Sequence, residues 1–271
     1  MKQLLSIDTN PKTIKGQKYG FMTGVLYLAP ADMAATKKLR INVCPMAVLA
    51  QCKVPCLNSA GRGAFNSVQK ARIAKTRRFF TDRAGFMADM VWSVEALLRK
   101  AKRVRLTPIV RPNGTSDIRW ELVSCVRNMG TKKNPNWVQF RNLMEAFPTV
   151  QFYDYTKITN RNLVQLRDAQ TDKITSNGWP KNYDLTFSYS GVPEFQPIVA
   201  KAAANKLLQR IAVVFHDRNN LPKTFNVNGK KLRCVDGDDS DLRHTDSRGV
   251  VVALYAKGKA RKDNSGFVVN N

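Results

Sequence analysis

The feature that most constrains the fold is an alternation of short apolar segments with helical segments along most of the chain. Six segments have the length and composition of buried strands, namely residues 105–110, 150–155, 183–189, 210–215, 232–236 and 249–256. Helices are expected between some of them, over residues 136–147, 160–169 and 193–209. This rhythm predicts an α/β fold with a mostly parallel sheet, arranged as a complete or partial TIM-like barrel with its helices outside.

The N-terminal part adds two expected strands and a long helical region. The strands cover residues 21–29, before Pro30, and 39–44, before Pro45. A helical pattern without proline covers residues 64–103, and Thr81-Asp82 is a plausible break and new N-cap within it. No linker divides the chain, so we expect one α/β domain over residues 1–271, with a β-containing extension over 1–40 and a basic tail over 257–271.

Composition excludes several classes of protein. Hydrophobic residues make up 43% of the 271 residues, which is ordinary for a packed domain and argues against disorder along the whole chain. No run of about 18 apolar residues suggests a membrane span, and the first ten residues lack the apolar stretch of a signal peptide. We therefore expect a protein of the cytoplasm. Five cysteines in so long a chain do not form a disulfide framework.

The charge predicts a negatively charged partner. Lysine and arginine total 45 against 20 acidic residues, which gives a net charge of +25. Such a potential attracts nucleic acid or another phosphate-bearing ligand, although a solvated basic surface is the alternative. The candidate nucleic-acid contacts are helical residues and a cluster near the C-terminus: Lys70, Arg72, Lys75, Arg77, Arg78, Lys257 and Lys259.

Polar residues follow nearly every expected strand. Parallel strands bring their carboxyl-end loops to one edge of the sheet, so we expect these groups to converge there. The groups are Cys44, Cys52 and Cys56; Asn113, Ser116 and Asp117; Tyr153, Tyr155 and Lys157; Ser188; and Asp236 and Asp238.

The three cysteines of the first loop have the spacing C-x7-C-x3-C. Three thiolates on one loop can hold three corners of an iron–sulfur cluster. A structural zinc ion needs a fourth ligand, which Cys125 or Cys234 would supply only by folding close. The alternative is that the thiols are small buried apolar groups.

The acidic run over residues 236–241 resembles a cation-binding loop in composition only, because it lacks the spacing of an EF-hand. One of its carboxylates could instead bind ribose hydroxyls, as acidic residues do in nucleotide sites. Asp117, Asp236, Asp238 and Asp241 together are the candidates for a magnesium-dependent nuclease or transferase. The plain alternative is an acidic turn that offsets local positive charge.

Four segments in order resemble a known family, namely Cys44-Pro45 with Cys52 and Cys56, then residues 113–117, 152–157 and 185–188. Over residues 42–190 they are similar to uncharacterised tailed-phage proteins of the mycobacteriophage gene-product-88 family. That layout is in turn similar to radical S-adenosylmethionine barrels, although the cysteine spacing differs from their CxxxCxxC. The resemblance implies a [4Fe–4S] cluster on Cys44, Cys52 and Cys56, with S-adenosylmethionine bound at its open iron.

The same resemblance assigns roles to the other polar residues. Asn113, Ser116 and Asp117 would hold S-adenosylmethionine, while Tyr153, Tyr155, Lys157 and Ser188 would line the substrate side. Three function classes therefore stay open. They are a cluster-dependent phage enzyme acting on a nucleotide or nucleic acid, a non-catalytic basic protein that binds nucleic acid or a host factor, and the magnesium-dependent nuclease or transferase. The sequence does not decide whether the protein is an enzyme, and it does not give an oligomeric state.

Overall fold

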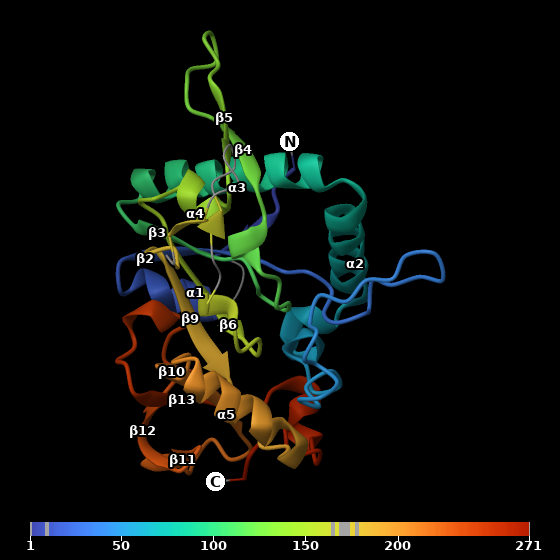
Figure 1. The fold of residues 1–271 in the computed structure, drawn as a ribbon, viewed down its shortest axis with the longest axis vertical. Helices are drawn as coiled ribbons and strands as arrows, with labels where there is room; N and C mark the ends of the chain where they lie inside the picture. The colour runs from blue at the N-terminus through green and yellow to red at the C-terminus, as the bar shows by residue number, and fades with distance from the viewer. Residues whose placement is uncertain (1, 9–10, 164–165, 168–173, 177–178, 271) are drawn as a thin grey trace.

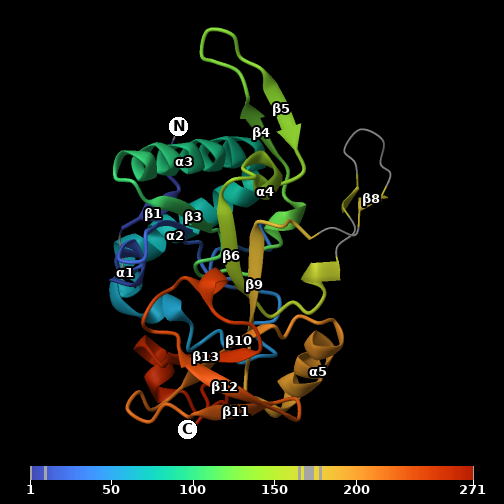
Figure 2. The same cartoon turned by 90° about the vertical axis from the view of Figure 1, so that its left-hand side faces the viewer.

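The computed structural model describes residues 2–8, 11–163, 166–167, 174–176 and 179–270. Its centre is a nine-stranded mixed sheet, which is strongly twisted between its two ends (Figure 2). In spatial order the strands are β1 (Leu5–Ile7), β2 (Phe21–Leu26), β3 (Thr107–Arg111), β6 (Gln151–Thr156), β9 (Tyr183–Ser188), β10 (Arg210–Phe215), β13 (Val250–Tyr255), β12 (Lys230–Asp236) and β11 (Thr224–Val227).

Strand direction confirms the expected α/β class with a mostly parallel sheet. Neighbouring strands from β2 to β12 pair in parallel, whereas the edge strands β1 and β11 pair antiparallel with their neighbours. Among the described strands, β1 and β11 form the two edges of the sheet and do not pair with each other. The pairing that would close the sheet into a barrel is therefore not formed by these strands. The expected extension over residues 1–40 contributes β1 and β2 to this sheet.

Two large apolar clusters between the sheet and its helices form most of the core. The long helices α2 (Asn66–Thr81) and α3 (Arg83–Arg103) meet at an angle, as Figure 1 shows. Asp82 separates them, as expected, and its side chain accepts a hydrogen bond from the Gly85 amide as the N-cap of α3. Helix α3 packs against β1, β2 and β3, and its residues Phe86, Met90 and Val94 are buried in the apolar cluster on that side.

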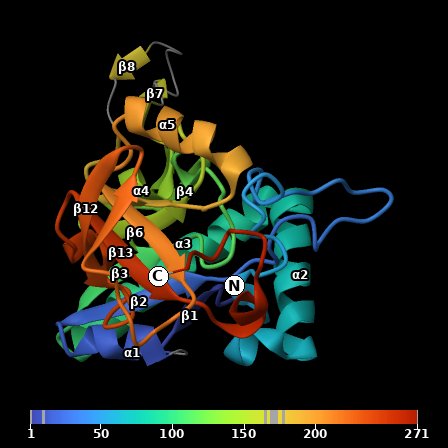
Figure 3. The same ribbon diagram turned by 90° about the horizontal axis from the view of Figure 1, so that it is seen from below.

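The remaining helices are shorter. They are α1 (Pro11–Gln17), α4 (Leu143–Ala146) and α5 (Gln196–Ala204). Helix α5 packs on the half of the sheet formed by β9, β10 and β13, with Val199 against Phe187 and Ile211 in a second apolar cluster. In the view of Figure 3, α5 lies at the top of the molecule and α2 at its right-hand side. No helix in the described part of the chain combines the length and apolar character needed to cross a membrane.

Three sequence expectations about local structure are wrong or only partly confirmed. Residues 136–147 form a strand and one helical turn, because β5 (Trp137–Phe140) pairs with β4 (Cys125–Asn128) and Asn142 caps α4 only afterwards. Residues 39–44 form no strand, since Ile41 and Val43 are buried in a small apolar cluster instead of pairing. Of the helix expected over 160–169, the described part holds a 3-10 turn (Arg161–Leu163) and β7 (Leu166–Arg167), which pairs with β8 (Ile174–Ser176).

Candidate functional site

The cysteine-bearing loop between β2 and α2 is held against the loops that follow three other strands. We call this carboxyl-end edge of the sheet the rim. The bonds that hold it are Asp117 N to Val43 O (2.8 Å), Ser190 Oγ to Ala50 O (2.9 Å) and Lys259 N to Ser59 Oγ (3.1 Å). Asp117 follows β3, Ser190 follows β9 and Lys259 follows β13. The fold therefore gathers chain segments that are far apart in the sequence around the cysteines.

We call the three residues Cys44, Cys52 and Cys56 together the thiol group. All three are free cysteines and are half-buried. The pKa of the Cys44 thiol is raised to about 12, mainly by burial and in smaller part by charge on Asp117, Cys56 and Cys52. Burial also raises the pKa of Cys52 and of Cys56, and charge on Cys52 adds to the effect on Cys56. Because such charge effects fall off with distance, the three thiols share one neighbourhood.

The thiols are not arranged around a single metal ion. Among the described residues, no three histidine, cysteine or carboxylate side chains come close enough together to hold one. Cys44 also packs against the apolar cluster of Ala29, Ile41 and Val43, whereas Cys52 packs against a different cluster that contains Phe267. A tetrahedral zinc site with Cys125 or Cys234 as fourth ligand is therefore not formed in this arrangement.

Lys157, directly after β6, places a buried cation beside the thiols. Its Nζ donates to Ser188 O (2.8 Å), Ser188 Oγ (2.9 Å) and Tyr189 O (3.2 Å). Its backbone amide donates to Asp117 Oδ2 at 2.8 Å. Burial lowers the pKa of Lys157, while negative charge on Cys52, Asp117 and Cys44 would raise it. Lys157 and Ser188, both predicted from the sequence, are thus in direct contact at the rim.

Asn113 organises the loop that follows β3. Its Oδ1 accepts from Ser116 Oγ (2.8 Å), the Ile118 amide (2.9 Å) and Trp120 Nε1 (3.0 Å). Its Nδ2 donates to Ile118 O and Asp154 Oδ2, both at 2.9 Å. These bonds use both ends of the Asn113 amide and the Ser116 hydroxyl, so the two side chains fix the loop's shape.

A buried ionic network that sequence reasoning missed lies behind this loop. Arg161 is fully buried, and its Nη2 lies 2.6 Å from Glu121 Oε2 and 2.7 Å from the Tyr183 hydroxyl. Its Nη1 lies 3.3 Å from Asp117 Oδ1. The Tyr183 hydroxyl in turn donates to Asp154 Oδ2 at 2.6 Å. No local signal marks Arg161 as buried, because all its partners come from other segments of the chain.

The network also contains a perturbed carboxyl group. Burial raises the pKa of Asp154 to about 7, against the opposing effects of Arg161, Tyr183 and the Asn113 amide. Burial likewise raises the pKa of Asp117, although Arg161 and the Lys157 amide oppose it. Both carboxyl groups thus depend on their donors to stay ionised in the protein interior.

Tyr153 and Tyr155 belong to a separate group on the sheet face that the loop after β12 covers. Asp241 in that loop accepts from Arg111 Nη1 (2.9 Å) and from the Tyr153 hydroxyl (3.2 Å), and the Tyr155 hydroxyl lies 3.5 Å away. The Arg111 guanidinium also lies over the Tyr155 ring, 4.6 Å from its centre. The structure therefore places the two tyrosines with Asp241 and Arg111, and no bond of the described residues joins them to the thiol group.

A family model described as gene product 88 matches residues 3–271 of the chain. The chain belongs to the gene product 88 family. This match confirms the resemblance to the phage family that the rim residues suggested and extends it from residues 42–190 to nearly the whole chain. No curated protein and no solved structure matches the chain. The comparisons give no support to the further similarity with radical S-adenosylmethionine barrels.

In this gene product 88 protein the carboxylates of the acidic run over residues 236–241 are engaged by nearby groups of the protein. Asp236 Oδ1 accepts from the Asp238 amide at 2.7 Å, and Asp238 Oδ1 pairs with Lys257 Nζ at 3.0 Å. Asp117 instead contacts Arg161, and Asp241 contacts Arg111. The four carboxylates proposed for magnesium are thus divided among different contacts.

The basic residues predicted on α2 are placed unequally. Arg72 is buried and donates to Asn58, and burial lowers the pKa of Lys75 to about 8. Arg78 pairs with Asp89 (2.6 Å) and Asp82, while Arg77 is exposed and its Nε donates to Ala34 O. Lys70 is exposed, as is Lys259 on the C-terminal tail. Helix α2 therefore presents fewer cations to solvent than its sequence suggests.

Proposed function

We propose that this phage protein carries a thiolate-ligated metal centre at the rim, held by Cys44, Cys52 and Cys56, and that the centre is an iron–sulfur cluster. The observation that carries the proposal is the shared neighbourhood of three free thiols from one loop. Three hydrogen bonds, one between backbone groups and two through serine hydroxyls, fix that loop against the loops after β3, β9 and β13.

A metal centre at these thiols must displace their protons. Burial raises the pKa of all three, so the protein alone favours the neutral thiol over the thiolate. A bound metal reverses this preference because it stabilises the thiolate and releases its proton. Lys157 contributes in the same direction, since its charge lowers the pKa of Cys52. We infer that Lys157 helps Cys52 to become a ligand and that its bonds to Ser188 and Tyr189 hold it in place.

The occupant we propose is a cluster and not a single zinc ion. An iron–sulfur cluster interposes iron and sulfide between its ligating thiolates, so these stand farther apart than the ligands of one ion. Among the described residues, no three donors come close enough together to hold one ion, which argues against the zinc site. A cluster with three cysteine ligands would supply redox chemistry and one iron open to another ligand.

The finer predictions have less support. The side chains expected to hold S-adenosylmethionine are engaged within the protein, Asn113 and Ser116 with their own loop and Asp117 with Arg161 and Lys157. Binding of that cofactor and action on a nucleotide therefore remain predictions. The magnesium-dependent alternative has no group of three carboxylates in the described residues to carry it.

Anaerobic reconstitution with ferrous iron and sulfide tests the thiol centre. We expect a brown protein whose visible absorbance bleaches on reduction, with up to about four irons and matching acid-labile sulfide per chain. Cys44→Ser, Cys52→Ser and Cys56→Ser should each lose most of the iron. Cys125→Ala and Cys234→Ser are the matched controls and should keep it, because Cys125 lies in the apolar core and Cys234 on β12.

Two results would count against the proposal. Iron that binds equally well to the three rim variants would show that the thiol group is not its ligand. Stoichiometric zinc, bound in place of iron and lost in the same variants, would keep the thiol centre and overturn the cluster.

A further inference from the structure

A β-hairpin projects from the body of the protein at the end opposite the C-terminus (Figures 1 and 2). Its strands β4 and β5 form a two-stranded antiparallel sheet, separate from the central one, in which Cys125 pairs with Phe140 and Asn128 with Trp137. We call residues 125–140 the hairpin arm. Residues 129–136, which join the two strands, are all exposed.

The two faces of the hairpin arm have different surroundings. Cys125 and Phe140 share one face, which packs on the core beneath α3, and Arg127 on the same face pairs with Glu95. Residues opposite one another in an antiparallel pair share a face, so Trp137 and Val126 lie on the other one. Trp137 is 67% exposed and Val126 is 47% exposed. The outer face thus presents a large aromatic ring to solvent.

Free positive charge lies on the connection of the hairpin arm and on the end of α3 that the arm's inner face meets. No acidic residue occurs over residues 122–144, whereas Lys132 and Lys133 lie in the exposed connection of the arm. Arg99, Lys102 and Arg103 are exposed on the last turns of α3, which packs against β4. With the described residues, none of these five cations forms a hydrogen bond or ion pair. The charge is therefore available to an outside partner.

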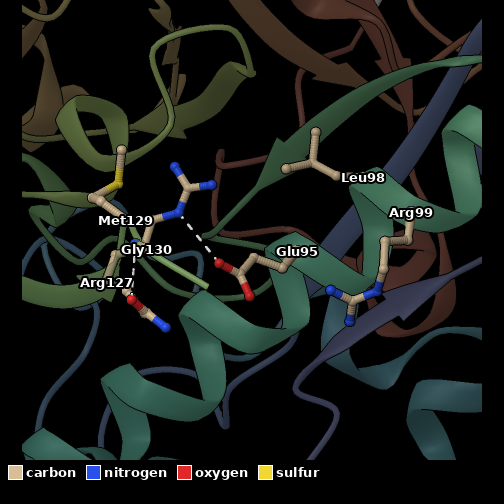
Figure 4. Close-up of a pocket in the computed structure, with 7 residues that line it drawn as sticks. Glu95, Leu98, Arg99, Arg127, Met129 and Gly130 are labelled. Atoms are coloured by element: carbon tan, nitrogen blue, oxygen red, sulfur yellow. Dashed lines mark hydrogen bonds and ion pairs between the residues drawn. The ribbon is translucent and has the colours of Figure 1, made fainter. Parts of the chain in front are cut away.

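A cavity of about 400 Å³ lies where the hairpin arm meets α3 (Figure 4). It is lined by Leu98 and Arg99 from α3 and by Met129 and Gly130 from the arm, with the Arg127–Glu95 ion pair between them. Met129 is 52% exposed. A flexible polyanion could therefore follow the arm from its connecting loop to the end of α3 and meet Arg99 there.

We propose that the hairpin arm binds single-stranded nucleic acid, with an unpaired base stacked on Trp137 and phosphates at Lys132, Lys133 and Arg99. A basic arm with no acidic residue of its own attracts the phosphates of a polynucleotide. An exposed aromatic ring can stack on the π-face of any base. A duplex keeps its bases stacked inside, so an isolated exposed tryptophan favours the single strand. The inference rests on the surface alone and does not depend on the proposed thiol centre.

Fluorescence anisotropy with a labelled deoxythymidine oligonucleotide, an RNA of matched length and a duplex tests this at several salt concentrations. Trp137→Ala should weaken single-strand binding about tenfold, because base stacking on an aromatic ring has that order of effect. Trp137→Phe keeps a π-face and should retain most of the affinity. Lys132→Glu with Lys133→Glu should weaken binding and reduce the slope of log K against log salt by roughly 1.4, about 0.7 for each lost phosphate contact.

The matched charge control is Lys37→Glu with Lys38→Glu, two exposed lysines in the loop between β2 and α2. It changes the net charge equally but should leave affinity much less affected. Equal losses in both double variants would show general attraction and overturn the hairpin arm as the site. Exclusive binding of duplex, or no effect of Trp137→Ala, would overturn base stacking. Comparison of the DNA and RNA oligonucleotides identifies the preferred strand.

Discussion

Replacing Arg161 by methionine should destabilise the protein more than any exposed charge change. The guanidinium is fully buried and binds Glu121 through Nε (3.0 Å) and Nη2 (2.6 Å), as well as the Tyr183 hydroxyl and Asp117. Methionine has a similar length but leaves the buried Glu121 carboxylate with Arg119 Nε, at 3.3 Å, as its remaining cationic contact. The carboxylate then lies in the interior with one contact to a cation where it had three, and the neighbouring Asp117, whose pKa burial already raises, loses Arg161 as well.

The magnitude follows from the burial of both partners, since Arg161 and Glu121 side chains are 0% exposed. Removing one member of such a pair costs about 3–5 kcal/mol of unfolding free energy. For a chain of this size that corresponds to a fall of roughly 6–20 °C in Tm. The exposed Arg141–Glu145 pair gives a matched control, because Arg141→Met should cost at most about 1 kcal/mol.

Urea unfolding followed by circular dichroism measures both variants. Adding Glu121→Gln to Arg161→Met should recover at least about 1 kcal/mol, because it removes the stranded charge. A loss below about 1 kcal/mol in Arg161→Met, or no recovery in the double variant, would refute the view that this network is a buried, mutually compensated ion cluster.

Three other outcomes are expected. Burial raises the pKa of Asp154 from 3.8 to about 7, so the folded state favours the protonated carboxyl group. Its contribution to the free energy of unfolding is complete below the unfolded pKa and is lost as the pH rises toward about 7, by up to about 4 kcal/mol relative to Asp154→Asn. A difference in unfolding free energy between the two proteins that does not change with pH would contradict the shift. At about pH 8, iodoacetamide should alkylate Cys44 far more slowly than a peptide thiol, because its pKa is raised. Lys157→Met should slow the alkylation of Cys52, because the lysine charge lowers the pKa of that thiol. Rapid labelling of these thiols in mass spectra would contradict their burial. Asp82→Ala should cost about 1 kcal/mol by thermal unfolding through loss of the α3 N-cap, whereas an unchanged Tm would show that the cap contributes nothing.

The parallel strands could be predicted because a strand that is buried on both faces is a nearly continuous run of apolar residues, which is visible in the sequence itself. Residues 210–215 and 250–255 are nearly continuous apolar runs, and both form interior strands of the sheet. Their direction followed from the alternation with helices, and the convergence of the loops after them followed from direction alone. Thus the contact of Lys157 with Ser188, and that of Asp117 with the cysteine loop, were within reach of sequence reasoning.

The remaining features depend on tertiary partners that the sequence does not display. The segment 137–140 alternates like a strand, but its pairing with 125–128 becomes visible only when the turn between them is known. Ile41 and Val43 have strand-like composition and are buried by local packing without a partner strand. Arg161 looks like a surface residue of a short helix, yet the carboxylates of Asp117 and Glu121, both in the segment between β3 and β4, hold it inside the protein.

X-ray absorption at the iron edge of the anaerobically reconstituted protein tests the thiol centre most directly, because it reports the atoms bound to iron. The account predicts sulfur as the dominant neighbour, together with the short iron–iron scattering of a cluster. It also predicts that both signals weaken in Cys52→Ser and persist in Cys234→Ser. Iron surrounded only by oxygen and nitrogen, with no iron–iron scattering and no response to Cys52→Ser, would contradict the central claim.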